Sequence, residues 1–237
     1  SRLKPMYDAA LALVNHIGYT NAGTIEFLVD DDRHFYFLEM NTRIQVEHPV
    51  TEMTTGIDIV EHQIRIAVNE HLGFTQKEVQ RRGHSIEARI YPEDPATYTP
   101  VSGTVDEIVY PKIENLRIDD AMFSGYEVTP YYDAMMAKVI SWGKSRKRAI
   151  ATLVKGLQEF QIQGITHNVP LIQQVLQEEE FKNGKYSTRL LADLSEHAKE
   201  TLTHEQELET TAAVAVAMGA LFGKRQSQQP SSWKTYG

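Results

Sequence analysis

A stretch of twelve residues, from Glu39 to Val50, concentrates groups that can do chemistry. It holds two carboxylates, one guanidinium, two side-chain amides and an imidazole, and it follows the apolar segment 35–38. Burying any one of these groups costs free energy unless it is paired, so a packed core does not require such a mixture. Polar residues this dense, directly after a strand, are typical of a site held by a rigid scaffold.

The carboxylates of Glu26 and Glu39, with the amide of Asn41, are candidate ligands for a hard cation. Residues 24–29 and 35–38 read as the strands of a hairpin whose turn is 30–33, which places Glu26 opposite Glu39. Magnesium is typically held by one or two carboxylates together with substrate phosphates. A surface carboxylate pair would explain the same residues, and the aspartates at 30–32 are expected to form a solvated loop.

Arg43, Gln45, Glu47 and His48 follow within the same stretch. A planar guanidinium can bind a small oxyanion such as carboxylate or bicarbonate through two hydrogen bonds. Glu47 could act as a general base if it is partly desolvated. Two simpler interpretations stay open at this point: Arg43 holds Glu47 in an ion pair, and His48 only makes loop hydrogen bonds.

Two charged residues outside the stretch also stand out. Arg89 lies in the middle of an alternating strand pattern, so it either extends to solvent or points into a polar site. Asp133 follows two tyrosines and is either a turn residue or the partner of a buried cation.

The remaining pattern indicates an α+β chain, with strands first and helices after them in its second part. Helices are predicted over 6–17 (ending at Gly18), over about 15 residues from 55–58 onward, over 145–160 with Ser145 as N-cap, and over 168–177 and 188–197. Strands are predicted over 84–91, 103–110, 116–119, 125–128 and 137–142. The polar segment 74–82 separates two predicted domains, 1–75 and 83–195, and 196–237 is predicted to be a helical tail and linker.

Bulk composition excludes several classes of protein. The 237 residues are 41% hydrophobic and 24% charged, with a formal net charge of −8, which argues against a general nucleic-acid or membrane-surface binder. The chain has no cysteine, so disulfides and thiol catalysis are excluded and zinc would need His and carboxylate ligands. No apolar run is long enough to span a membrane.

The run from Glu39 to Glu52 resembles the signature of biotin carboxylases, the ATP-grasp enzymes or domains of acetyl-CoA, propionyl-CoA and pyruvate carboxylases. The resemblance continues through residues 23–28, 83–90, 93–95, 130–133 and 164–168 and covers roughly residues 5–195. It implies the C-terminal part of an ATP-grasp domain, an antiparallel hairpin plus helices. A biotin carboxylase C-terminal domain, an antiparallel sheet plus helices, would follow.

The resemblance also implies roles for particular residues. Glu26, Glu39 and Asn41 match the positions that bind Mg²⁺ or Mn²⁺ on ATP, and Leu28 and Leu38 match apolar contacts of the adenine. Arg43, Gln45 and the backbone of Val46 match the bicarbonate cradle. Glu47 matches the base that deprotonates bicarbonate, and Arg89 matches the residue that stabilises the biotin enolate. Asp133 matches a position near the active site and dimer interface.

Further expectations follow from the same resemblance. Biotin would arrive on a carrier protein or domain, a carboxyltransferase would use the product, and the C-terminal domain, around Arg117 and Phe123, would form a homodimer. The location would be cytoplasmic, or the mitochondrial matrix in a eukaryote. The family's N-terminal domain and its lid, with a Gly-rich loop and lysines, have no counterpart here, so the chain alone is expected to be inactive.

Two alternatives to this reading remain. The chain could act as a dimerisation or structural module of a multidomain carboxylase. It could also belong to an ATP-grasp ligase with a different acceptor, as in carbamoyl-phosphate or purine synthesis. The segments around Arg43–His48 and Arg89 match the biotin-linked members most closely.

Overall fold

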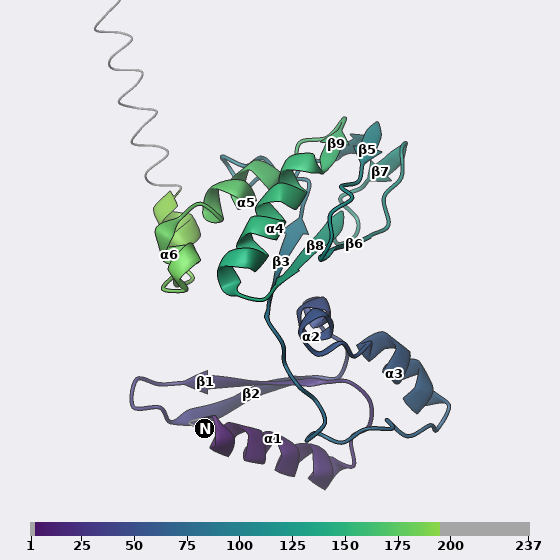
Figure 1. The fold of residues 1–237 in the computed structure, drawn as a ribbon, viewed down its shortest axis with the longest axis vertical. Coiled ribbons are helices and arrows are strands. Elements are labelled where there is room, and N and C mark those ends of the chain that lie inside the picture. Colours follow the sequence, from purple (N-terminus) through teal and green to yellow (C-terminus); the bar gives the residue numbers. More distant parts are fainter. Residues whose placement is uncertain (1–2, 195–237) are drawn as a thin grey trace, which may run out of the picture. The chain divides into compact units, whose positions relative to one another are not determined.

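A computed structural model describes residues 3–194 (Figure 1). Residues up to Lys182 form one compact unit, and a second unit begins at Asn183. The elements, in chain order, are α1 (Lys4–Ile17), β1 (Thr24–Val29), β2 (Phe35–Asn41), α2 (His48–Thr55), α3 (Ile59–Ala67), β3 (His84–Ile90), β4 (Gly103–Val105), β5 (Glu107–Val109), β6 (Leu116–Asp120), β7 (Tyr126–Val128), β8 (Ala137–Gly143), α4 (Arg146–Glu159), β9 (Gln161–Gln163), α5 (Val169–Val175) and α6 (Glu179–Asn183).

The first part of the chain is built on the predicted hairpin. Strands β1 and β2 pair antiparallel, and Glu26 lies directly opposite Glu39, which confirms the predicted register. The second strand is longer than predicted and includes Glu39 and Asn41, so these residues lie on a strand and not after one. The pairing shifts by one residue at Leu38, a β-bulge between the apolar end of the hairpin and its polar end.

The helix predicted to start within 55–58 is present as α3, but it has nine residues and not about 15. A second helix, α2, precedes it and was not predicted. Helix α2 already begins at His48 with Pro49 in its first turn, and it ends at Gly56, whose φ of 75° is in the left-handed region. Asp58 then caps α3, its side chain accepting a hydrogen bond from the Glu61 amide. Proline early in a helix and glycine directly after it are ordinary helix boundaries, so the second half of the polar stretch is helical.

The second part of the chain contains an antiparallel sheet with the strand order β3-β8-β6. The strand predicted over 103–110 is instead two strands, because β4 pairs with β7 and β5 pairs with β9. Helix α4 has Ser145 as N-cap, as predicted, and the Ser145 side chain accepts from the Arg148 amide. Strand β9 and helix α6 were not predicted.

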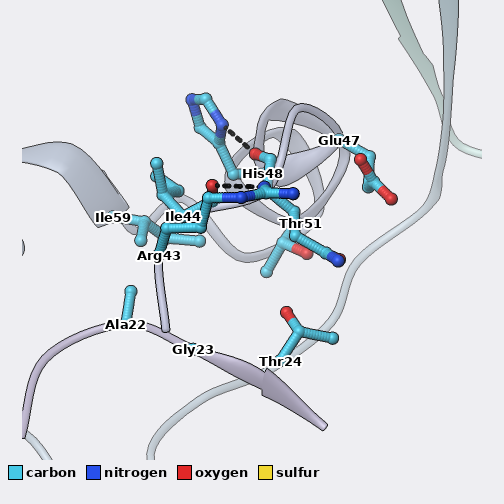
Figure 2. Close-up of a pocket in the computed structure, with 10 residues that line it drawn as sticks. Ala22, Gly23, Thr24, Arg43, Ile44, Glu47, His48, Thr51 and Ile59 are labelled. Carbon is cyan, nitrogen blue, oxygen red and sulfur yellow. Dashed lines mark hydrogen bonds between the residues drawn. The ribbon is translucent and has the colours of Figure 1, made fainter. Parts of the chain in front are cut away.

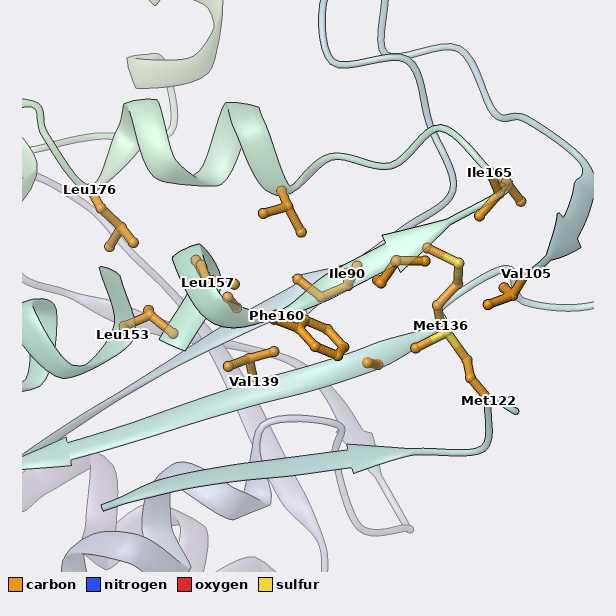
Figure 3. Packing of buried hydrophobic residues seen from close by; sticks show 14 of the residues in the cluster. Ile90, Val105, Met122, Met136, Val139, Leu153, Leu157, Phe160, Ile165 and Leu176 are labelled. Carbon is orange, nitrogen blue, oxygen red and sulfur yellow. The ribbon is translucent and has the colours of Figure 1, made fainter. Parts of the chain in front are cut away.

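The hydrophobic core lies between this sheet and α4 (Figure 3). Alternate residues of β3 and β8, including Ile90 and Val139, point into the core, where they pack with Leu153 and Leu157 of α4. Ile140 is fully buried but is not part of this cluster, because it belongs to the opposite face of the sheet. Helix α2 contacts β3 and β8. The sheet therefore has an apolar face toward α4 and a second face that carries Arg89 and Lys138.

The mixed helices and antiparallel strands confirm the predicted α+β class. Of the helix predicted over 188–197, residues 190–194 are helical and the rest falls outside the described residues, as does the tail 196–237. Within residues 3–194, no helix has the length and apolar character needed to cross a membrane. The predicted domain division at 75–83 remains a prediction.

Candidate functional site

The polar end of the hairpin brings the predicted metal ligands together. Glu26 and Glu39 are cross-strand partners, and Asn41 is two residues from Glu39 on the same side of β2. The Asn41 Nδ2 group donates to Glu26 Oε1 at 2.9 Å and to Glu39 Oε1 at 3.2 Å. Gln45 Nε2 donates to the same Glu26 oxygen at 3.3 Å. The two carboxylates are therefore held side by side by amide donors.

This donor set fits a hard cation in part. Two neighbouring carboxylates leave room for phosphate oxygens and water, which is the usual environment of Mg²⁺. Asn41 directs its amide nitrogen at the carboxylates, while its Oδ1 accepts from Arg43 at 3.3 Å. In this orientation Asn41 positions the carboxylates. Among residues 3–194, no group of three or more His, Asp or Glu side chains is arranged to hold a metal by itself.

A pocket of about 160 Å³ adjoins the carboxylates through Gln45, which lines the pocket and donates to Glu26. Figure 2 shows the lining of this pocket. Arg43, Gln45 and Glu47, the residues predicted to meet bicarbonate, all line it. Its remaining walls come from the turn before β1, the start of β1, helix α2 and the start of α3. The size suits a small ion, and the lining offers one cation, one amide and one carboxylate.

Arg43 does not pair with Glu47, and the His48 side chain bonds to the preceding loop. The Arg43 guanidinium donates to Asn41 Oδ1 at 3.3 Å and to the Ile44 carbonyl at 3.2 Å, and it makes no ion pair with Glu47. His48 Nδ1 lies 2.8 Å from the Gln45 carbonyl, so the His48 side chain forms a hydrogen bond with the loop that precedes α2 (Figure 2). Arg43 therefore keeps donor capacity for an anion in the pocket.

Glu47 is paired instead with Arg89. Arg89 Nη2 donates to Glu47 Oε2 at 2.6 Å, and Arg89 Nε donates to Glu87 Oε1 at 3.1 Å. Of the two interpretations of Arg89, the structure supports the polar site. Burial opposes the charge on Arg89, yet the hydrogen bond to Glu87 and the charge of Glu47 outweigh it and raise the pKa of the guanidinium. Arg89 therefore stays a cation between two carboxylates.

Glu87 was not singled out from the sequence. Its side chain is 5% exposed, and its Oε2 has no hydrogen-bond partner among the described residues. Burial raises the pKa of Glu87, while the hydrogen bond from Arg89 and the charge of Lys138 partly oppose that rise. The signal in the sequence was weak, because Glu87 occupies an ordinary place in an alternating strand.

A second group of charges, whose mutual contacts were not predicted, joins α2 to the sheet. Arg117 Nη1 donates to Glu52 Oε2 at 2.6 Å, and its Nε and Nη2 donate to the two carboxylate oxygens of Asp119 at 2.6 and 2.8 Å. The hydrogen bonds to Asp119 and Glu52 raise the pKa of Arg117 despite its partial burial. Arg117, predicted for a dimer contact, thus has partners within its own chain.

Three other predicted site residues, Leu28, Leu38 and Asp133, do not line the pocket. Leu28 and Leu38 are 58% and 50% exposed on the hairpin, so their role at an adenine remains a prediction. Asp133 Oδ1 accepts from the Met135 amide at 2.9 Å, the geometry of a turn residue. Of the two interpretations of Asp133, the structure supports the turn.

Comparison with known proteins assigns the two parts of the chain separately. Residues 87–193 match the family described as biotin carboxylase C-terminal domain. The chain belongs to the biotin carboxylase family. Residues 1–75 match the carbamoyl-phosphate synthase L chain, ATP binding domain.

Individual relatives agree with this assignment. The chain is 49% identical over 184 residues to biotin carboxylase 2 of Bacillus subtilis, covering 78% of this chain and 41% of the relative. It is 39% identical over 222 residues to the mitochondrial propionyl-CoA carboxylase alpha chain of Caenorhabditis briggsae, covering 92% of this chain and 30% of the relative. The chain therefore spans less than half the length of these relatives.

A solved structure gives the same picture. The biotin carboxylase domain dimer of Hydrogenobacter thermophilus 2-oxoglutarate carboxylase, in complex with MgADP, ADP and bicarbonate, superposes with a TM-score of 0.75 at 41% identity. The match covers 81% of this chain and 43% of that chain. The predicted fold class and family are thus confirmed.

Proposed function

We propose that this chain supplies one wall of an active site that carboxylates biotin with ATP and bicarbonate. The observation that carries the proposal is the convergence of Arg43, Gln45 and Glu47 on one pocket next to the paired carboxylates of Glu26 and Glu39. The Hydrogenobacter thermophilus relative was crystallised with bicarbonate and MgADP, which fit the two halves of this site.

Each residue has a task that its geometry allows. Arg43 attracts bicarbonate into the pocket and Gln45 donates a hydrogen bond to it. Glu47 accepts the bicarbonate proton, and the carbonate oxygen so exposed attacks the γ-phosphorus of ATP. The bond between that phosphorus and ADP breaks, which gives carboxyphosphate and ADP. Because phosphoryl transfer depends mainly on positioning and charge neutralisation, little else is required of these side chains.

The remaining roles concern the binding of ATP and the neutralisation of charge. Glu26 and Glu39 would hold Mg²⁺ or Mn²⁺, which neutralises the phosphates of ATP when it is bound. Leu28 and Leu38 would contact the adenine. Arg89 would stabilise the negative charge on the ureido oxygen of biotin, which requires its guanidinium to share or exchange its bond to Glu47. In the resting state the hydrogen bond from Arg89 favours one orientation of the Glu47 carboxylate.

A hybrid enzyme tests the proposal. In it, this chain replaces the aligned segment of Bacillus subtilis biotin carboxylase 2, and bicarbonate-dependent ATP cleavage and carboxylation of free biotin are measured. Glu47→Gln should lower both rates by roughly 10²-fold or more, the usual contribution of a positioned base. The control Glu61→Gln, an exposed carboxylate on α3, should leave both rates unchanged. Normal carboxylation by the Glu47→Gln hybrid would contradict the proposal.

A homodimer contact through the C-terminal part is a second proposal. Phe123 is 61% exposed and packs edge-on against Tyr126, which offers an apolar contact point. The relative named above forms a domain dimer. Sedimentation equilibrium of the chain and of Phe123→Ser tests this contact, and a monomer at high micromolar concentration would contradict it. A biotin carrier, a carboxyltransferase, and residence in the cytoplasm or the mitochondrial matrix also belong to the proposal.

A further inference from the structure

The face of the β3-β8-β6 sheet that points away from α4 is unusually rich in charge. Arg89 of β3, Lys138 of β8 and Asp119 of β6 are direct cross-strand neighbours, so their side chains lie on one face. Arg89 and Lys138 are like charges in directly opposite positions, an arrangement that destabilises a sheet unless other groups compensate. This arrangement therefore calls for a specific explanation.

Lys138 is the most buried of these groups. Its side chain is 11% exposed, in the middle of the central strand of the sheet. Removing an ammonium group from water is costly unless it is paired and hydrogen-bonded. Asp119 Oδ2 lies 3.5 Å from the Lys138 Nζ atom, and Asp119 is itself held by Arg117, so the lysine charge is balanced on a fixed carboxylate.

The hydrogen bond of Lys138 goes to the backbone next to the candidate base. Its Nζ donates to the carbonyl of Val46 at 3.2 Å, and the next residue in the chain is Glu47, whose carboxylate meets Arg89 at 2.6 Å. Two cross-strand neighbours thus hold two consecutive residues of the segment before α2. Lys138 holds the main chain at Val46, and Arg89 holds the side chain of Glu47.

We propose that Lys138 is a positioning residue that fixes the Val46–Glu47 peptide and, through it, the direction of the Glu47 carboxylate. The segment has few other fixed points. Its local backbone hydrogen bonds are those of the His48 amide to the Gln45 carbonyl and of the Val50 amide to the Glu47 carbonyl, at 3.2 and 3.1 Å. Without the lysine, the peptide before Glu47 is free to rotate, and the Glu47 carboxylate turns away from the pocket.

The catalytic consequence rests on the proposed function, whereas the structural part does not. The structural part is tested by amide hydrogen exchange in the 237-residue chain. Lys138→Met should raise the exchange rates of the His48 and Val50 amides about tenfold and leave those of α4 unchanged, since local and global opening are distinct events. Lys138→Arg, which keeps a charged donor, should restore slow exchange.

The matched control is Lys155→Met, which removes a lysine that is 64% exposed on α4 and should change neither region. If Lys138→Met does not fold, Lys138→Gln takes its place in the same measurement, because the Gln side chain stays polar but ends one bond short of the ammonium that reaches the Val46 carbonyl. Unchanged exchange at His48 and Val50 in a folded Lys138→Met or Lys138→Gln variant would overturn the inference.

The catalytic part is measured in the hybrid enzyme described above. Lys138→Met should lower kcat/KM for bicarbonate about tenfold and leave the KM for ATP near its original value, a split that a general loss of stability does not produce. If the unsubstituted hybrid shows no response to bicarbonate, the proposed function fails while the exchange result still decides the role of Lys138. If exchange rises and kcat/KM for bicarbonate does not fall, the catalytic part is overturned.

Discussion

Glu47 and Arg89 are 42 residues apart in the sequence, and the Nη2 atom of Arg89 lies 2.6 Å from Oε2 of Glu47. This bond connects the segment that follows the hairpin to the sheet of the biotin carboxylase C-terminal domain. Its side chains are 38% and 54% exposed, so solvent screens the pair.

The Glu47–Arg89 pair is expected to matter little for stability. Exposed ion pairs typically contribute about 0–1 kcal/mol. A double-mutant cycle of Glu47→Gln and Arg89→Gln, followed by urea unfolding of the chain, should therefore give a coupling energy below about 1 kcal/mol. A coupling of several kcal/mol would mean that the pair is structural and would weaken its assignment to the site.

Glu52 should behave in the opposite way. Its side chain is 7% exposed, Oε1 accepts from the Ile59 amide at 2.7 Å, and Oε2 accepts from Arg117 at 2.6 Å. Glu52→Ala removes the acceptor of the Ile59 amide, at the start of α3, and of the Arg117 guanidinium. Removal of one member of a buried pair costs roughly 3 kcal/mol or more. The control Glu61→Ala breaks an exposed pair with Arg65 and should cost about 0.5 kcal/mol or less. Equal losses of unfolding free energy in the two variants would contradict this assignment.

Glu87 should give stability a distinctive pH dependence. Burial raises the pKa of this carboxyl, so the folded state keeps its proton to a higher pH than the unfolded state does. The stability that this group contributes is therefore present at low pH and falls as pH rises from the ordinary carboxyl range through the folded pKa.

Glu87→Gln removes that dependence and keeps an oxygen for Arg89 Nε. The unfolding free energy of the variant minus that of the wild type should become more positive as pH rises upward from the ordinary carboxyl range, because the raised pKa of Glu87 delays the loss of its proton in the folded state. Urea unfolding at several pH values measures this difference. Glu114→Gln, at an exposed turn position, is the control. A constant difference across the range would show that Glu87 is not desolvated in solution.

The paired carboxylates of the hairpin should set the metal requirement. In the hybrid enzyme, Glu26→Gln should raise the Mg²⁺ concentration for half-maximal ATP cleavage at least tenfold, because one of two anionic oxygen ligands is lost. Asp31→Asn, in the exposed turn of the same hairpin, should leave that concentration unchanged. A similar shift in both variants would indicate a general effect of charge and not a ligand.

The sequence was sufficient where local patterns decide the structure. The hairpin register of Glu26 and Glu39 and the N-cap at Ser145 follow from alternation, turn residues and capping chemistry, and all were predicted correctly. The start of α2 was missed because its polar residues outweighed two boundary signals, Pro49 and Gly56, that would have located the helix.

The rest depends on contacts between distant segments. Lys138 stands in a run that reads as an apolar strand, and Glu87 stands in an ordinary alternating one. Their importance becomes visible only when β8 lies beside β3 and α2 approaches both. A pattern within one strand cannot report which residue of another segment will neutralise a buried charge.

The two-sided sheet restricts how β3 can change in length. Because side chains alternate along a strand, Ala88 and Ile90 enter the core while Glu87 and Arg89 face the other way. Insertion or deletion of one residue within His84–Ile90 would exchange these two sets, driving an arginine into the apolar core and an isoleucine into the charged layer. A single substitution in β3 alters one face of the sheet, whereas a one-residue change in strand length would disrupt the core and the charged face together.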